Sequence, residues 1–201
     1  MLVKTKAIVI STLKFQEKSL IVKCFTQSHG LKSYFVRNAF SGKKNNQKIA
    51  YFQPLSILEI EAVHKNKGAL EHFKEIKTAI PFQTIHLDIV KSTMVLFLSE
   101  ILHHAIHEEE QNEDLFKYLE TALQWLDTHN ETSNFHLILM LEITKFLGFY
   151  PDTSDQDLPF FEMNEGVFSL FQAISCLSEH ESFLLKKLID LRLDSDQKVF
   201  Y

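Results

Sequence analysis

Residues 6–36, KAIVISTLKFQEKSLIVKCFTQSHGLKSYFV, contain three short runs rich in β-branched and aromatic residues, separated by polar breaks. Lys6–Leu13, Ser19–Thr26 and Leu31–Val36 are therefore predicted to be strands. The break at 27–30, QSHG, ends in a glycine that can adopt a positive φ, which favours a hairpin. This stretch predicts an antiparallel sheet at the start of the chain.

The pattern of short strands continues to residue 80. Residues 41–48, SGKKNNQK, are polar and basic without periodicity and are predicted to form a loop. Ile57–Val63 alternates apolar and polar residues, and Leu70–Ile80 is a candidate final strand. Five short strands joined by turns predict a small antiparallel β-barrel over residues 1–80.

After Pro81 the apolar residues follow a helical period instead. The first predicted helix covers Ile89–Ile106, and a second begins at Asn112 or Glu113. A third is capped by residues 132–134 and ends at Gly148. The last two cover Gly166–Leu177 and Glu179–Leu193, the latter with Ser178 as its cap. Residues 151–166 are a long connection. The expected fold class is α+β, with a barrel over 1–80 and a helical bundle domain over 81–201.

Charge divides the chain at the same place. Residues 1–80 carry 14 Lys and Arg against 5 Asp and Glu, a net +9, whereas residues 81–201 carry a net −14. Clustered cations release counterions from a polyphosphate, so nucleic acid is the favoured partner of the basic half. Solvation of a small β-domain is the alternative use of these lysines. The candidate contacts are Lys14, Lys23, Lys32, Arg37, Lys43, Lys44, Lys48, Lys65 and Lys67.

An OB-type barrel also needs aromatic rings on which bases can stack. Tyr34 and Phe35 lie on opposite faces of the third predicted strand, so at most one of them is such a platform. Tyr34 shares its face with Lys32 and is the predicted DNA-binding ring, with burial inside the barrel as the alternative.

The sequence gives little support for other classes of protein. Cys24 and Cys176 are the only cysteines, which indicates a reducing, cytoplasmic setting, and no apolar stretch approaches the ~20 residues that span a membrane. Walker A, GxGxxG and GxSxG motifs are absent, so neither an enzyme nor a cofactor is predicted. His103 and His107, with Glu100, could present ligands on one helical face, which leaves a metal-dependent enzyme as an alternative.

Several segments, in their order along the chain, resemble the RecO family of bacterial DNA repair and recombination mediators. They are Ala7–Ile10, Phe15–Glu17, Ser19–Val22, His29–Gly30, Val36–Ala39, Glu100–Leu102 and Leu147–Pro151. The resemblance implies an N-terminal OB-fold that binds single- and double-stranded DNA and anneals complementary strands. It also implies that RecR and RecF are partners, that recombinase is loaded onto protein-coated single strands, and that the protein associates with the nucleoid.

Two further expectations come from the resemblance. Many RecO proteins carry a four-cysteine zinc site, but residues 151–166 contain no cysteine, so no structural zinc is expected and Phe160 and Phe161 are predicted to anchor this region instead. The family also docks the acidic, Phe-ending tail of single-stranded-DNA-binding protein, for which Lys117 and Lys145 are the candidate cations. An RNA-binding OB protein and a pure protein adaptor remain alternatives.

Overall fold

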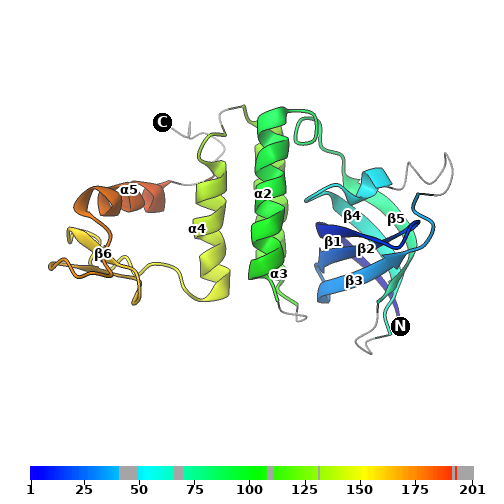
Figure 1. The fold of residues 1–201 in the computed structure, drawn as a ribbon, viewed down its shortest axis with the longest axis horizontal. Coiled ribbons are helices and arrows are strands. Elements are labelled where there is room, and N and C mark those ends of the chain that lie inside the picture. The colour runs from blue at the N-terminus through cyan, green and yellow to red at the C-terminus, as the bar shows by residue number, and fades with distance from the viewer. Residues whose placement is uncertain (41–48, 66–69, 108–110, 131, 192, 194–201) are drawn as a thin grey trace. The chain divides into compact units, whose positions relative to one another are not determined.

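The structure, a computed structural model, describes residues 1–40, 49–65, 70–107, 111–130, 132–191 and 193. Contacts divide the chain into two compact units, Met1–His129 and Asn130–Tyr201. In the described residues, the first unit holds five strands, a short 3₁₀ helix and two α-helices, and the second holds two α-helices and a two-stranded hairpin (Figure 1). The domain boundary predicted near residue 80 falls at the end of the last strand of the first unit, and as a domain boundary it stays a prediction.

Five antiparallel strands form the sheet of the first unit. They are β1 (Leu2–Phe15), β2 (Ser19–Thr26), β3 (Gly30–Val36), β4 (Ile57–Val63) and β5 (His72–Ile80). Their order across the sheet is β3-β2-β1-β4-β5. The bounds of β2 and β4 are those predicted, whereas β1 is longer than predicted at both ends.

The length of β1 allows it to pair with two strands. Its first half lies against β4 and its second half against β2. The register with β2 shifts between Val9 and Ser11, which indicates a bulge. Because a bulge bends a strand and increases its twist, β1 can pass from one side of the barrel to the other.

Glu71, just before β5, closes the sheet. The N–H of Phe35 donates to the Glu71 carbonyl at 2.8 Å, and the N–H of Glu71 donates to the Ser33 carbonyl at 2.8 Å. The two outer strands are thereby joined, and the sheet becomes a barrel of the OB type. Together with the helices that follow, this barrel confirms the predicted α+β fold class.

The barrel is filled by side chains from all of its first four strands. The buried members of this core are Ala7, Val9, Leu20, Val22, Cys24, Tyr34, Ala39, Phe52, Leu58, Ile60 and Ala62. Phe52 belongs to η1 (Ala50–Phe52), a 3₁₀ helix before β4. Burial raises the pKa of the Cys24 thiol, so this side chain behaves as a small apolar residue.

Two helices of the first unit lie beside the barrel. They are α2 (Ile89–Ala105), whose N-cap is Asp88, and α3 (Glu113–Thr128), whose N-cap is Asn112. The ring of Phe116 on α3 lies 6.0 Å from that of Phe25 on β2, and Lys6 on β1 donates to Glu120 at 2.7 Å. An apolar contact and an ion pair therefore fix α3 on the sheet.

The segment between β5 and α2 is held by Asp127 near the end of α3. Its carboxylate accepts the backbone N–H groups of Gln83, Thr84 and Ile85 at 2.9, 2.8 and 3.1 Å. Burial raises the pKa of Asp127, but these hydrogen bonds outweigh burial and leave the pKa below its usual range. Buried Lys91 completes the cluster by donating to the Thr84 hydroxyl at 2.7 Å. We call these residues the Asp127 clamp.

The second unit contains α4 (Phe135–Leu147), β6 (Phe160–Glu162), β7 (Val167–Ser169) and α5 (Glu179–Asp190). Gly148 ends α4 in the left-handed region with φ 82°, as predicted. Ser178 caps α5 and forms a reciprocal capping box with Glu181, which confirms that helix.

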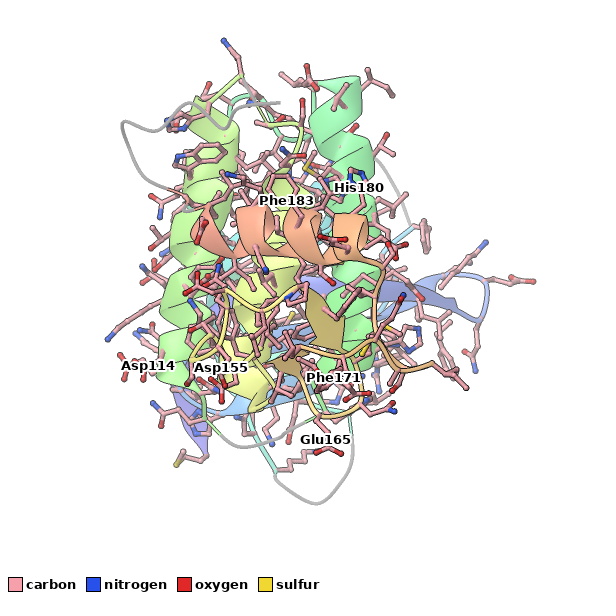
Figure 2. All side chains as sticks on the ribbon, turned by 90° about the vertical axis from the view of Figure 1, so that its left-hand side faces the viewer. Asp114, Asp155, Glu165, Phe171, His180 and Phe183 are labelled. Atoms are coloured by element: carbon pink, nitrogen blue, oxygen red, sulfur yellow. The ribbon has the colours of Figure 1, made fainter. Side chains whose placement is uncertain are left out.

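The helix predicted over residues 166–177 is wrong. Gly166 takes a φ of 69° in the turn between β6 and β7, and β7 pairs with β6 instead of starting a helix. The segment that follows carries Phe171, and α5 carries Phe183; both rings are exposed (Figure 2). The apolar spacing after Gly166 therefore reflects one buried strand residue, Phe168, followed by mostly exposed apolar side chains and by Leu177, which packs against the same cluster.

Phe161 anchors the hairpin on the helices of its unit. Phe161, Phe168 and Ile189 are buried in one cluster, and the two phenylalanine rings meet edge to face at 5.1 Å. The N–H of Phe161 donates to the hydroxyl of buried Ser182 at 2.9 Å. The residues here do not fit a four-cysteine zinc site, because Cys176 is the only cysteine of the unit.

Among the residues that the structure describes, no helix is long and apolar enough to cross a membrane.

Candidate nucleic-acid interface

A groove with a volume of about 240 Å³ opens on the barrel between β3, η1 and β5. It is lined by Phe35, Val36, Arg37, Tyr51, Phe73, Lys74 and Ile76. Three of these side chains are aromatic and two are cationic. Rings and cations in one groove are what single-stranded nucleic acid requires, because bases stack on the rings while phosphates bind the cations. We call this feature the aromatic groove.

Phe35 sits at the centre of a small set of rings on the rim. Phe15, at the end of β1, meets Phe35 edge-on at 5.9 Å, and His72 approaches it at 6.2 Å. The guanidinium of Arg37 lies 6.0 Å from the centre of the Phe35 ring. Such a contact orients a cation beside an aromatic surface, so Arg37 is presented where a phosphate and a base could be bound together.

A second ring and cation pair lies outside the groove. Lys14 Nζ is 5.5 Å from the centre of the Phe40 ring, and both side chains are exposed. Among the described residues, the structure thus places the predicted DNA-binding cations Lys14 and Arg37 beside partly exposed aromatic rings.

Tyr34 is not available as a stacking platform, and the prediction that named it is corrected. Its side chain is 0% exposed, its ring stacks on Phe73 at 4.2 Å, and its hydroxyl is hydrogen-bonded to His64 Nε2 at 2.8 Å. Burial, with smaller effects of Cys24 and Glu71, raises the pKa of Tyr34. Of these two neighbours on β3, it is Phe35, on the opposite face, whose ring lines the groove.

The remaining predicted lysines fall into two groups. Lys23 is half-buried and close enough to His103 on α2 that, after burial, it helps lower the pKa of that histidine. Lys32 is half-buried on β3, and Lys65 is exposed after β4. Lys43, Lys44, Lys48 and Lys67 lie outside the described residues. Of these seven lysines, the structure therefore describes Lys23, Lys32 and Lys65.

Tyr51, Phe73 and Lys74 were missed by sequence reasoning. Lys74 lines the groove while its ammonium pairs with Glu61, and Lys4 pairs with the same carboxylate at 3.3 Å. Hydrogen bonds from Lys74 and then Lys4 lower the pKa of Glu61. The sequence signal for Phe73 was the alternation of residues along β5, which places it on the face that turns toward the core. Nothing in that alternation indicates that Tyr51 of η1 lies at the same groove.

The histidine face on α2 is not arranged as a metal site. His104 bonds Glu100 at 3.0 Å, and within the described ranges no group of three or more His, Cys, Asp or Glu side chains is placed to hold a metal ion.

The two lysines proposed for partner binding are each engaged with a neighbouring carboxylate. Lys117 on α3 pairs with Glu113 at 3.1 Å, and Lys145 on α4 pairs with Glu142 at 2.7 Å. Lys145 also lies 4.5 Å from the centre of the Tyr150 ring. Near it in sequence, Phe149 is 64% exposed, so the end of α4 combines a cation with accessible aromatic surface.

Comparison with known proteins gives a consistent result over nearly the whole chain. The family model described as Recombination protein O N terminal matches residues 1–82, and the one described as Recombination protein O C terminal matches residues 86–191. Proteins named DNA repair protein RecO are similar to it. That of Flavobacterium johnsoniae is 74% identical over all of this chain and 85% of its own length, that of Flavobacterium psychrophilum is 71% identical over 97% and 82%, and that of Christiangramia forsetii is 41% identical over 99% and 84%.

Proposed function

The chain belongs to the RecO family of DNA repair proteins, and we propose that it binds single- and double-stranded DNA through the barrel of residues 1–80. The resemblance noted from the sequence is confirmed by these matches. The observation that supports the barrel as the DNA site is the aromatic groove, with Arg37 beside Phe35. Phosphate contacts by Arg37, Lys14 and the lysines of the 41–48 segment supply affinity that does not depend on base sequence.

The proposed role includes annealing of complementary strands. Two strands repel each other through their phosphates, and a cationic surface lowers that repulsion. A ring that holds a base unstacked keeps that base available for pairing with a second strand. Neither step needs a nucleotide cofactor or a chemical reaction, so the proposed role is not enzymatic.

Residues 81–201 are proposed to bind proteins. Their net −14 charge disfavours DNA, and the end of α4 offers Lys145 with exposed Phe149. A peptide that ends in an acidic, aromatic sequence is the matching chemistry, as in the tail of single-stranded-DNA-binding protein. Lys117 on α3 is the second candidate cation. Through these contacts, and with RecR and RecF as partners, the protein would help load recombinase onto protein-coated single strands.

Fluorescence anisotropy of labelled DNA at several salt concentrations tests the DNA-binding proposal. We expect the logarithm of affinity to fall linearly with the logarithm of salt, with a slope of about −0.7 for each single-strand phosphate contacted. Arg37→Gln and Lys14→Gln should each reduce that slope by roughly one contact. Lys117→Gln, in the acidic part of the chain, is the matched control and should leave the slope unchanged.

Absence of binding at low salt would overturn the DNA-binding proposal. Equal binding by all variants would place the contacts elsewhere on the chain. A matched RNA oligonucleotide in the same assay addresses the alternative of an RNA-binding protein, which a preference for RNA would favour. For the partner site, Lys145→Glu should weaken capture of a synthetic acidic peptide ending in Phe, whereas Lys14→Glu should not.

A further inference from the structure

We infer that the aromatic groove holds one unpaired nucleobase, so that single strands gain a base-dependent contact that duplex DNA lacks. This inference rests on the proposed DNA binding and adds the site at which the two forms of DNA are distinguished. The rings involved are Phe35 on β3, Tyr51 in η1 and Phe73 on β5, and Arg37 lies beside them.

The size of the groove favours a single planar group. Its volume of about 240 Å³ is below the roughly 300–1,000 Å³ of pockets that bury drug-sized ligands. Phe73 is held by the core, because its ring stacks on Tyr34 at 4.2 Å and lies 5.7 Å from Phe52, nearly parallel to it. Phe35 is held edge-on by Phe15. The rings are thus already held in place by the core, and a base that enters orders few side chains.

The charges around the groove select a base with a phosphate and not a neutral aromatic peptide. The Arg37 guanidinium beside Phe35 can bind a phosphate next to a stacked base. Lys74 also lines the groove, but its ammonium is paired with the Glu61 carboxylate, so Arg37 is the main candidate for the phosphate contact. Positive charge and stacking surface therefore meet within the length of one nucleotide.

Only unpaired bases can use such a site. In a duplex the face of each base is covered by its neighbours, so a ring outside the helix has no base face to stack on. Duplex DNA would still bind through phosphates, which Arg37 and the other barrel cations contact regardless of strand form. The groove consequently adds affinity for single strands alone.

The test uses three DNA ligands of the same length, about 15 nucleotides, near the upper site size of an OB-fold. They are oligothymidine, an abasic strand with the same phosphates but no bases, and a duplex. Wild-type protein should bind oligothymidine at least about fivefold more tightly than the abasic strand, the low end of what one stacking ring provides. Phe35→Leu, which keeps apolar volume but removes the ring, should abolish that preference and change abasic and duplex binding much less. Tyr51→Leu should act in the same direction.

Two controls make the result specific. Phe149→Leu replaces an exposed ring of the other unit and should preserve the preference for oligothymidine. Arg37→Gln should weaken the binding of all three ligands to a similar extent. Thermal melts of each variant verify that the protein is folded.

Equal binding of oligothymidine and the abasic strand by wild-type protein would overturn the inference while leaving DNA binding intact. An equal loss of affinity for all three ligands in Phe35→Leu would also overturn it, because the ring would then act on phosphate contacts or on the fold. Failure of wild-type protein to bind any of the three would instead overturn the proposed function. Tight binding of an aromatic peptide that displaces no DNA would assign the groove to a protein partner.

Discussion

Asp127→Ala should destabilise the protein by about 2–4 kcal/mol, because this change removes the acceptor for three backbone N–H groups at once. The N–H of Gln83 is exposed and can turn to water, so it contributes little. Those of Thr84 and Ile85 are partly buried, so each donor that loses its acceptor costs roughly 1–2 kcal/mol, the lower part of the range for an unsatisfied donor. Asp127→Asn keeps one acceptor oxygen and should cost about 1 kcal/mol.

Denaturation in urea measures this cost directly. Trp125, the single tryptophan, is buried two residues before Asp127 and stacks on His129 at 4.2 Å, so its fluorescence reports unfolding of this region. Asp155→Ala, at an exposed carboxylate of the second unit, is the control and should change stability by less than about 0.5 kcal/mol. A loss below about 1 kcal/mol for Asp127→Ala would refute the reasoning, since it would mean that the clamp N–H groups are satisfied equally well without the carboxylate.

Phe161→Ala should destabilise the second unit by about 3–5 kcal/mol in a calorimetric melt, because it empties the centre of an apolar cluster; the same change at half-exposed Phe160 should cost clearly less. Ser178→Ala should cost about 1 kcal/mol by removing the capping box of α5, and helicity measured by circular dichroism should fall slightly. Burial, with an added effect of His29, lowers the pKa of His64 in the folded protein. The folded state therefore keeps this stabilisation in full above about pH 6.5, the ordinary pKa of histidine, and loses it as the pH falls below that value. The melting temperature should therefore drop between about pH 7 and 5, less so in His64→Gln, and equal pH dependence in both proteins would contradict this assignment.

The barrel strands could be predicted from the sequence because period and turn residues are local signals. β2 and β4 have the predicted bounds, and Gly30, where the turn meets β3, has a φ of 60°, as its sequence indicates. The helix over residues 166–177 failed for a nonlocal reason. Phe168 is buried by Phe161 of the opposing strand, and helical spacing alone cannot reveal such a partner.

The stacking surface could be predicted only in part. Alternation placed Tyr34 and Phe35 on opposite faces, but which face turns inward depends on the closure of β3 by Glu71. The groove also needs Tyr51 and Phe73, which come from separate elements and meet Phe35 only when the barrel is closed. Contacts that form only when the barrel closes therefore cannot be predicted from the residue pattern of a single strand.

The double pairing of β1 also has a consequence during protein synthesis. Leu2 lies opposite Val63, so the first half of β1 has no partner until the ribosome has released β4. The second half can pair earlier with β2, across a short turn at residues 16–18. Until β4 emerges, an apolar strand with an open edge is exposed to aggregation, a hazard of nonlocal β topologies. That strand contains Lys4, Lys6 and Lys14, and their charges oppose its association with other nascent chains.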